Sequence, residues 1–174
     1  VERICSEGNL EGFHMMCTVN ALCLFSLTDF LDYCIELKTK YGKDFPTFTL
    51  NILRFPSFQS PLVLPTNVKI KQRQILQNWL EKNMDNSAAH LLYALNLWRQ
   101  LAVNRTNISA DIKNIQVSID KAIELDPDNA PAYAVAAGFK AMRNYSSVDK
   151  LLIEKALNMG GDNSETLSAV IAAY

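Results

Sequence analysis

The sequence predicts a mixed fold in which a βαβα segment over residues 1–83 is followed by an all-α helical repeat over residues 84–174. In the first half the hydrophobic period changes from that of a strand to that of a helix and back, which is typical of strand–helix–strand units. The second half contains a repeat of 34 residues, and a fixed period of this length indicates a repeat architecture. Five identities carry the repeat: Ile119, Lys121, Ala122, Asp128 and Asn129 recur as Ile153, Lys155, Ala156, Asp162 and Asn163.

The first elements form a βαβ unit. Residues 13–19 alternate between apolar and polar and predict a strand, whereas residues 27–41 carry an apolar stripe at helical spacing. Ser26 or Thr28 can cap this helix, and Gly42 can end it. Residues 47–54 alternate again and predict a second strand. Such a unit normally makes a parallel sheet with a right-handed crossover, and we expect at least one further strand to complete it.

A loop rich in proline and serine over residues 55–65 leads to a helix that Thr66 can cap. The helix has an apolar side and an opposite face that holds Lys69, Lys71 and Arg73. Since no aromatic residues are interleaved with these cations, we expect a solvated face instead of a phosphate-binding one.

The segment 48–65, FTLNILRFPSFQSPLVLP, and the following KIKQRQILQNWL resemble the C-terminal part of the barrel in twitch-type radical SAM proteins. The resemblance covers residues 10–82 and implies the tail of a partial α/β barrel. It also implies S-adenosylmethionine and a [4Fe-4S] cluster in the parent protein. The Cys-x3-Cys-x2-Cys loop that would ligate the cluster is absent from the sequence, so we expect neither cofactor in this chain.

Polar residues near the ends of the two predicted strands are Asn20, Asn51 and Arg54. Active sites of barrels collect at the carboxyl ends of their parallel strands, so these residues are candidates for contact with a substrate or cofactor. The alternative is turn formation by the asparagines and a surface ion pair for Arg54.

Three Asp-Asn pairs, at 85–86, 128–129 and 162–163, each open a predicted helix. We expect helices over residues 87–103, 110–125, 130–143, 148–159 and from 164 onward. The first unit is longer than the second, and the polar loop 104–109 accommodates the extra residues.

The segment KAIELDPDNAPAYAVAAG closely resembles a tetratricopeptide repeat, with Ala122 and Ala137 at small-residue positions and Pro127 ending a helix. The resemblance implies a concave groove that binds a protein or peptide. By alignment, the candidate groove residues are Leu91, Leu95, Trp98, Arg99, Ala134, Gly138 and Met142. This lining lacks the Lys and Asn pairs with which some members bind a C-terminal carboxylate. Either the groove takes a hydrophobic peptide, or the N-terminal segment or neighbouring repeats fill it. His90 is expected to pack in the interior.

Composition excludes several functional classes. The chain has 174 residues, 49% hydrophobic and 20% charged, with a net charge of -1, so nothing favours nucleic acid as a partner. The longest apolar run, residues 19–27, is roughly half of what a bilayer-spanning helix needs, so no membrane partner is expected. All four cysteines lie in the first 34 residues with irregular gaps, which favours reduced, buried thiols, no metal site and a cytoplasmic location. Three glycosylation sequons, at Asn104, Asn107 and Asn144, point to secretion but are short enough to arise by chance.

No serine–histidine–acid set, phosphate-binding loop or zinc pattern is present in the sequence. The chain begins at Val1 and ends at Tyr174 directly after an apolar helix, so we expect a fragment of a longer protein. The leading hypothesis is a tetratricopeptide-type interaction module attached to the incomplete tail of a radical SAM-like enzyme domain and not catalytic by itself. The alternatives are a non-enzymatic helical-repeat adaptor and a regulatory protein.

Overall fold

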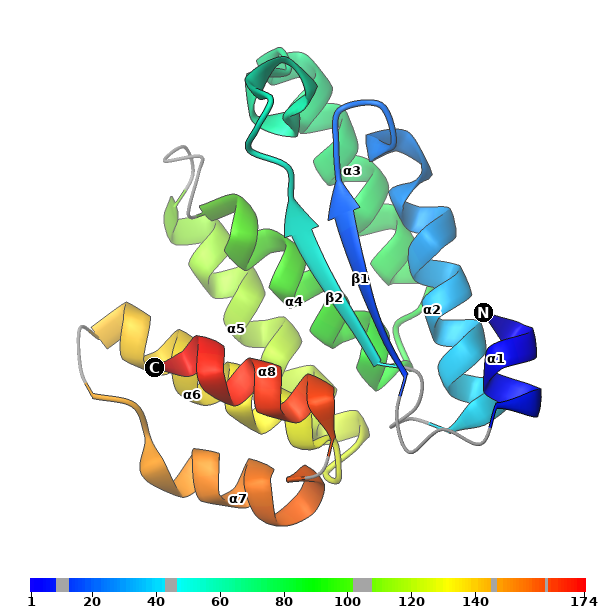
Figure 1. The fold of residues 1–174 in the computed structure, drawn as a ribbon. Coiled ribbons are helices and arrows are strands. Elements are labelled where there is room, and N and C mark those ends of the chain that lie inside the picture. The colour runs from blue at the N-terminus through cyan, green and yellow to red at the C-terminus, as the bar shows by residue number, and fades with distance from the viewer. Residues whose placement is uncertain (9–12, 43–46, 102–107, 145–146, 162) are drawn as a thin grey trace.

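The computed structural model describes residues 1–8, 13–42, 47–101, 108–144, 147–161 and 163–174. Within these ranges the chain is mostly helical, with a small parallel sheet (Figure 1). The elements are α1 (Glu2–Glu7), β1 (His14–Val19), η1 (Leu24–Ser26), α2 (Leu27–Tyr41), β2 (Thr47–Ile52), η2 (Ser57–Gln59), η3 (Pro61–Val63), α3 (Thr66–Lys82), α4 (Ser87–Leu101), α5 (Ile108–Leu125), α6 (Ala130–Asn144), α7 (Lys150–Gly160) and α8 (Ser164–Ala173).

The predicted βαβ unit is confirmed. Strands β1 and β2 pair in parallel, in a register that runs from His14 opposite Thr47 to Val19 opposite Ile52. Helix α2 connects them and ends at Gly42, whose φ of 109° is a conformation that favours glycine. Strand β2 ends two residues before the predicted end. The further strand that we expected is not found among the described residues, where the sheet has two strands.

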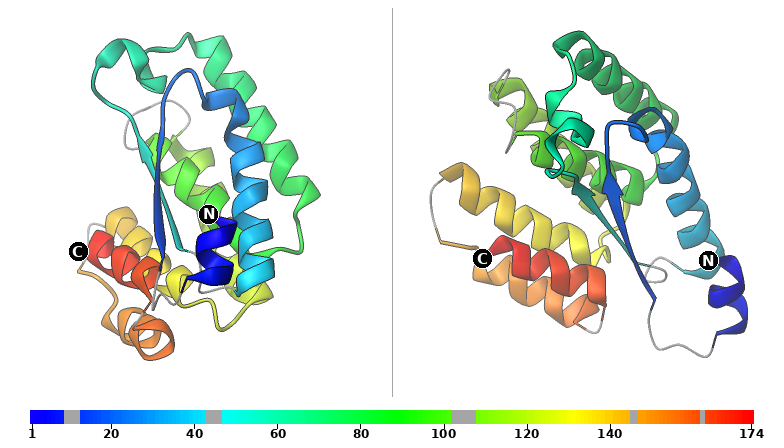
Figure 2. Two further views of the ribbon diagram at one scale, coloured as in Figure 1. Left: turned by 45° about the vertical axis from the view of Figure 1, so that its right-hand side comes forward. Right: turned by 45° about the horizontal axis from the view of Figure 1, so that its top comes forward.

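The alternating pattern of β1 places its residues on two different faces. Val19 is buried, whereas Met16 on the other face is 70% exposed. On β2, Phe48 is buried and its ring meets Phe30 of α2 edge-on, at 6.3 Å between centroids. Figures 1 and 2 show helices α2, α3 and α4 on one side of the two strands. The inner face of the sheet therefore packs on helices while the outer face is open.

Helices α4 to α8 follow the predicted order. Helix α4 packs mainly against α5, and α6 packs against both α7 and α8 (Figure 2). Small residues lie where the helices approach one another: Ala122 and Ala137, at the two predicted small-residue positions, are fully buried. Helix α5 begins two residues earlier than predicted and α7 two residues later. The predicted end of the first helix and most of the loop 104–109 lie outside the described residues.

One hydrophobic core runs through both predicted domains. It includes Val19, Leu31 and Phe48 from the first half, and Leu91 and Phe139 from the second. Helix α8 contributes a contact with β2 as well as with α6. The boundary after residue 83 therefore separates two sequence patterns that share one interior.

Two details differ from the expectations for the first half. Helix α1 was not predicted, because none of its residues is buried and it has no apolar stripe. The basic face of α3 is only partly solvated: Arg73 forms an ion pair with the buried Asp111 of α5, and Lys69 Nζ donates to the carbonyl of Leu62. Thr66 is the first residue of α3, and the cap position before it is occupied by proline.

Candidate functional site

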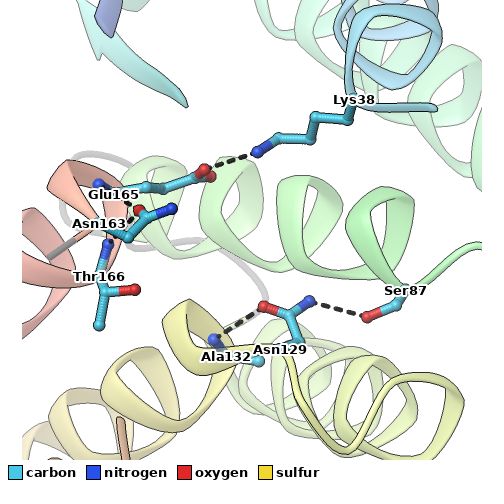
Figure 3. Close-up of polar contacts among 7 residues, drawn as sticks. All are labelled: Lys38, Ser87, Asn129, Ala132, Asn163, Glu165 and Thr166. Atoms are coloured by element: carbon cyan, nitrogen blue, oxygen red, sulfur yellow. Dashed lines mark hydrogen bonds and ion pairs between the residues drawn. The ribbon is translucent and has the colours of Figure 1, made fainter. Parts of the chain in front are cut away.

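The three repeated asparagines each cap a helix through Oδ1, and Figure 3 shows two of them, Asn129 and Asn163. Asn86 Oδ1 accepts from the amide of Ala89 at 3.0 Å, and Asn129 Oδ1 accepts from the amide of Ala132 at 3.3 Å. Asn163 Oδ1 accepts from the amide of Glu165 at 2.8 Å. Each bond satisfies an amide that the first helical turn leaves without an intrahelical partner. The asparagines of the three Asp-Asn pairs therefore mark helix starts, as predicted.

These capped ends surround a cavity of about 270 Å³ between α2, α4, α6 and α8. Lys38 of α2 and Glu165 of α8 form an ion pair across it at 2.7 Å, with side chains 10% and 11% exposed. Asn129 Nδ2 donates to Ser87 Oγ at 2.8 Å (Figure 3). Ser87 Oγ in turn donates to the carbonyl of Ala122 at 2.7 Å. Because these polar groups bind one another, they connect the sheet segment to the repeats and provide no argument for a ligand.

The predicted groove is covered along part of its length. Leu91 and Ala134 are buried, and so is Gly138, where an added Cβ would lie 2.9 Å from Ala173 Cα. Helix α8 therefore lies directly on α6, and Phe48 of β2 belongs to the same core as Leu91. At these positions the structure agrees with the alternative in which the N-terminal segment and a neighbouring helix fill the groove.

The remaining groove residues are less covered. Leu95, Trp98 and Arg99 are partly buried, and Met142 is 40% exposed. The Trp98 indole packs edge-on against Phe139 at 5.4 Å between centroids, and its Nε1 donates to Met142 Sδ at 3.2 Å. These contacts link the groove residues of α4 to those of α6.

A pocket of about 90 Å³ opens beside these residues, and its walls are mainly apolar. It is lined by Phe48, Leu91, Leu92, Leu95, Trp98, Arg99, Pro131, Val135, Glu165, Ser168, Ala169 and Ala172. Two of these side chains are charged. Glu165 pairs with Lys38, so Arg99 is the charge in this lining without a counterion among the described residues.

Arg99 is unusual for a surface arginine. Its Nη1 is buried and has no hydrogen-bond partner in the described part of the chain. Loss of hydration lowers the pKa of the guanidinium. Desolvating a charge without pairing it is unfavourable, and a guanidinium stays protonated in proteins. Arg99 therefore lies in the predicted groove and carries a partly desolvated charge that no acid among the described residues neutralises.

The structure separates the three strand-end candidates. Asn20 follows the turn alternative, because its Oδ1 accepts from the amides of Leu22 at 2.8 Å and Cys23 at 3.0 Å. Asn51 and Arg54 are exposed. A cavity of about 50 Å³ does lie at the carboxyl ends of the strands, beside Val19 and Ile52, but neither Asn51 nor Arg54 lines it.

Sequence reasoning missed two buried polar residues that line this strand-end cavity, Gln72 of α3 and Asn96 of α4. Gln72 is 2% exposed and Asn96 8%. Both amide atoms of Gln72, and Nδ2 of Asn96, are buried without a partner in the described residues. The available signal was position: Gln72 lies on the same helical stripe as Leu76 and Trp79. The cavity is large enough for ordered water, which would satisfy these amides.

The structure also places the cysteines and His90. All four are free thiols, and burial raises the pKa of Cys34 to about 12. Among the described residues no three His, Cys, Asp or Glu side chains gather closely enough to hold a metal ion. His90 packs as expected, since it is 9% exposed and its Nε2 lies 2.8 Å from the carbonyl of Met84. No helix in the described ranges has the length and hydrophobicity required to cross a bilayer.

Comparison with known proteins gives no assignment: no family model, curated protein or solved structure matches the chain. The resemblances to tetratricopeptide repeats and to radical SAM barrels therefore stay predictions.

Proposed function

We propose that residues 84–174 form a protein-interaction module of tetratricopeptide type, attached to the tail of a radical SAM-like enzyme domain and not catalytic by itself. The observation that carries the proposal is the apolar pocket beside Leu95, Trp98 and Arg99, with the exposed Met142 at its side. The repeated asparagine caps and the paired helices support the repeat assignment. S-adenosylmethionine and an iron–sulfur cluster belong to the parent protein in this proposal, and its location is the cytoplasm.

The binding surface in this proposal is shorter than a full groove. Since Leu91, Ala134 and Gly138 are buried, a peptide can reach only the less buried residues Leu95, Trp98, Arg99 and Met142. Tryptophan and arginine are the residues that most often dominate binding energy at protein interfaces. The flexible thioether of methionine adapts to different partners. The surface therefore suits a short segment that places one side chain in the pocket.

A displayed library of random peptides, selected on the immobilised full chain, tests this proposal. Peptides selected on the wild type should lose binding to the variant Trp98→Ala with Met142→Glu, because the change removes apolar contact and adds a charge. Leu151→Glu is the matched control, since Leu151 is 77% exposed on α7 and lies outside this surface. Helical circular dichroism should be unchanged in both variants. A failure to select peptides, or equal binding to all three proteins, would refute the proposed surface.

A non-enzymatic adaptor is the second candidate, and the shared core favours it. Helix α2 and strand β2 pack directly on the repeats, with the buried Lys38–Glu165 ion pair between them, so the first half can act as a cap for the helices. The parent protein, reconstituted with iron and sulfide, separates the two candidates. Cluster absorbance and cleavage of S-adenosylmethionine would support the enzyme, whereas a colourless and inert parent would support the adaptor.

A further inference from the structure

We infer that the peptide recognised at this surface carries an aspartate or glutamate whose side chain enters the pocket and pairs with Arg99. The inference rests on the proposed function and names the chemistry of the partner. It adds a requirement that a hydrophobic groove alone does not impose, namely one negative charge at a fixed position of the peptide.

The first argument is the state of the guanidinium. Arg99 Nη1 is removed from solvent and has no partner among the described residues, although the fork of five donors in arginine is suited to a carboxylate. A carboxylate in the pocket would supply the missing acceptor and neutralise the charge. A neutral amide could accept a hydrogen bond but would leave the charge unpaired.

The second argument is that the described residues offer Arg99 no suitable acid in this pocket. Glu165 lines the pocket, but it is engaged with Lys38 at 2.7 Å, and both side chains are almost fully buried. If Glu165 turned toward Arg99, its ion pair with Lys38 would break at a site where both side chains are almost fully buried, which is unfavourable. The existing ion pair therefore keeps Glu165 in place and leaves the position beside Arg99 open.

The third argument is size. A space of about 90 Å³ accepts a side chain but not a folded segment or a stretch of backbone. The walls beside Arg99 include Leu95, Val135 and Ala169, which suit the methylene groups of an acidic side chain. A side chain that combines short apolar carbons with a terminal carboxylate therefore fits both the lining and the charge.

A double-mutant cycle tests the pairing with peptides selected as described above. We expect the peptides to share one acidic position, and its change to glutamine to weaken binding about tenfold, as for the loss of a charged hydrogen bond. Arg99→Gln should weaken binding of the acidic peptide to a similar degree and leave the glutamine peptide unaffected. Arg99→Glu should recover binding when the peptide acid is replaced by lysine. Peptides that bind through Trp98 without any acidic preference would overturn the inference and leave the proposed function intact.

A second measurement does not depend on any peptide. Sodium propionate, titrated into the labelled full chain, should shift the Nε–H resonance of Arg99 in a saturable manner, with propionamide as the neutral control. The resonance is assigned by its disappearance in Arg99→Lys. Equal shifts with propionate and propionamide, or no shift with either, would overturn the carboxylate site even if selected peptides bind. Saturation by propionate alone would support the site even if the library yields no peptide.

Discussion

Replacement of Gly138 by alanine should weaken the contact between α6 and α8. An added Cβ would lie 2.9 Å from Ala173 Cα, 3.0 Å from Ala173 Cβ and 3.1 Å from Trp98 Cη2. The closest of these atoms belongs to the backbone of α8, so the helix itself has to shift. Overpacking of this kind costs about 1–3 kcal/mol, and the better helix propensity of alanine returns about 1 kcal/mol or less. We therefore expect a net loss of up to about 2 kcal/mol in the free energy of unfolding, instead of the gain that helix propensity alone would give.

Urea denaturation measures this loss, and hydrogen exchange locates it. Amides of α8 should exchange faster in Gly138→Ala, whereas those of α5 should keep their protection. The pair Met142→Gly and Met142→Ala reports helix propensity alone at a more exposed position of the same helix. Suppose that Gly138→Ala raises the free energy of unfolding by the same amount by which Met142→Ala exceeds Met142→Gly, and that the protection of α8 is unchanged. This result would mean that α8 does not lie on α6 as described.

Three further predictions concern the interior. Lys38→Met should lower the free energy of unfolding by about 3–5 kcal/mol, because it leaves Glu165 buried and unpaired. Adding Glu165→Gln should restore most of this loss, and urea denaturation that shows no recovery would contradict the prediction. With its pKa raised to about 12, Cys34 should resist iodoacetamide at pH 8 until urea unfolds the chain, whereas Cys5 should react in the native state, as peptide mass spectrometry can check. Asn129→Ala should lower the free energy of unfolding by about 1–2 kcal/mol, because it removes the cap of α6 and the contact with Ser87. An unchanged melting curve would contradict these two contacts.

Local patterns carried most of the successful predictions. The strands and α2 follow from hydrophobic spacing within a few residues, because the period reports directly which face is buried. The helix starts follow from Asn86, Asn129 and Asn163, since a cap acts within the first turn. Helix α1 was missed because it buries nothing, so it leaves no periodic signal.

Local sequence patterns could not predict which groove residues are covered by other parts of the chain. Alignment to a repeat places Leu91 and Gly138 on the concave side, but only the path of the whole chain brings Phe48 and α8 over them. The ion pair between Arg73 and Asp111 joins two helices that each look amphipathic and solvated in isolation. The candidate site could thus be predicted as a set of residues, whereas its accessible part and the unpaired charge of Arg99 depend on tertiary packing.

The ion pair between Lys38 and Glu165 spans 127 residues of sequence. During synthesis at about 5–20 residues per second, roughly 6 to 25 s pass between the appearance of these two residues at the ribosome. Until α8 has been made, Phe48 lacks the cover that this helix provides in the folded chain. The part of the core around Phe48 is thus completed only after α8 has been made, although strand β2 precedes it by more than a hundred residues.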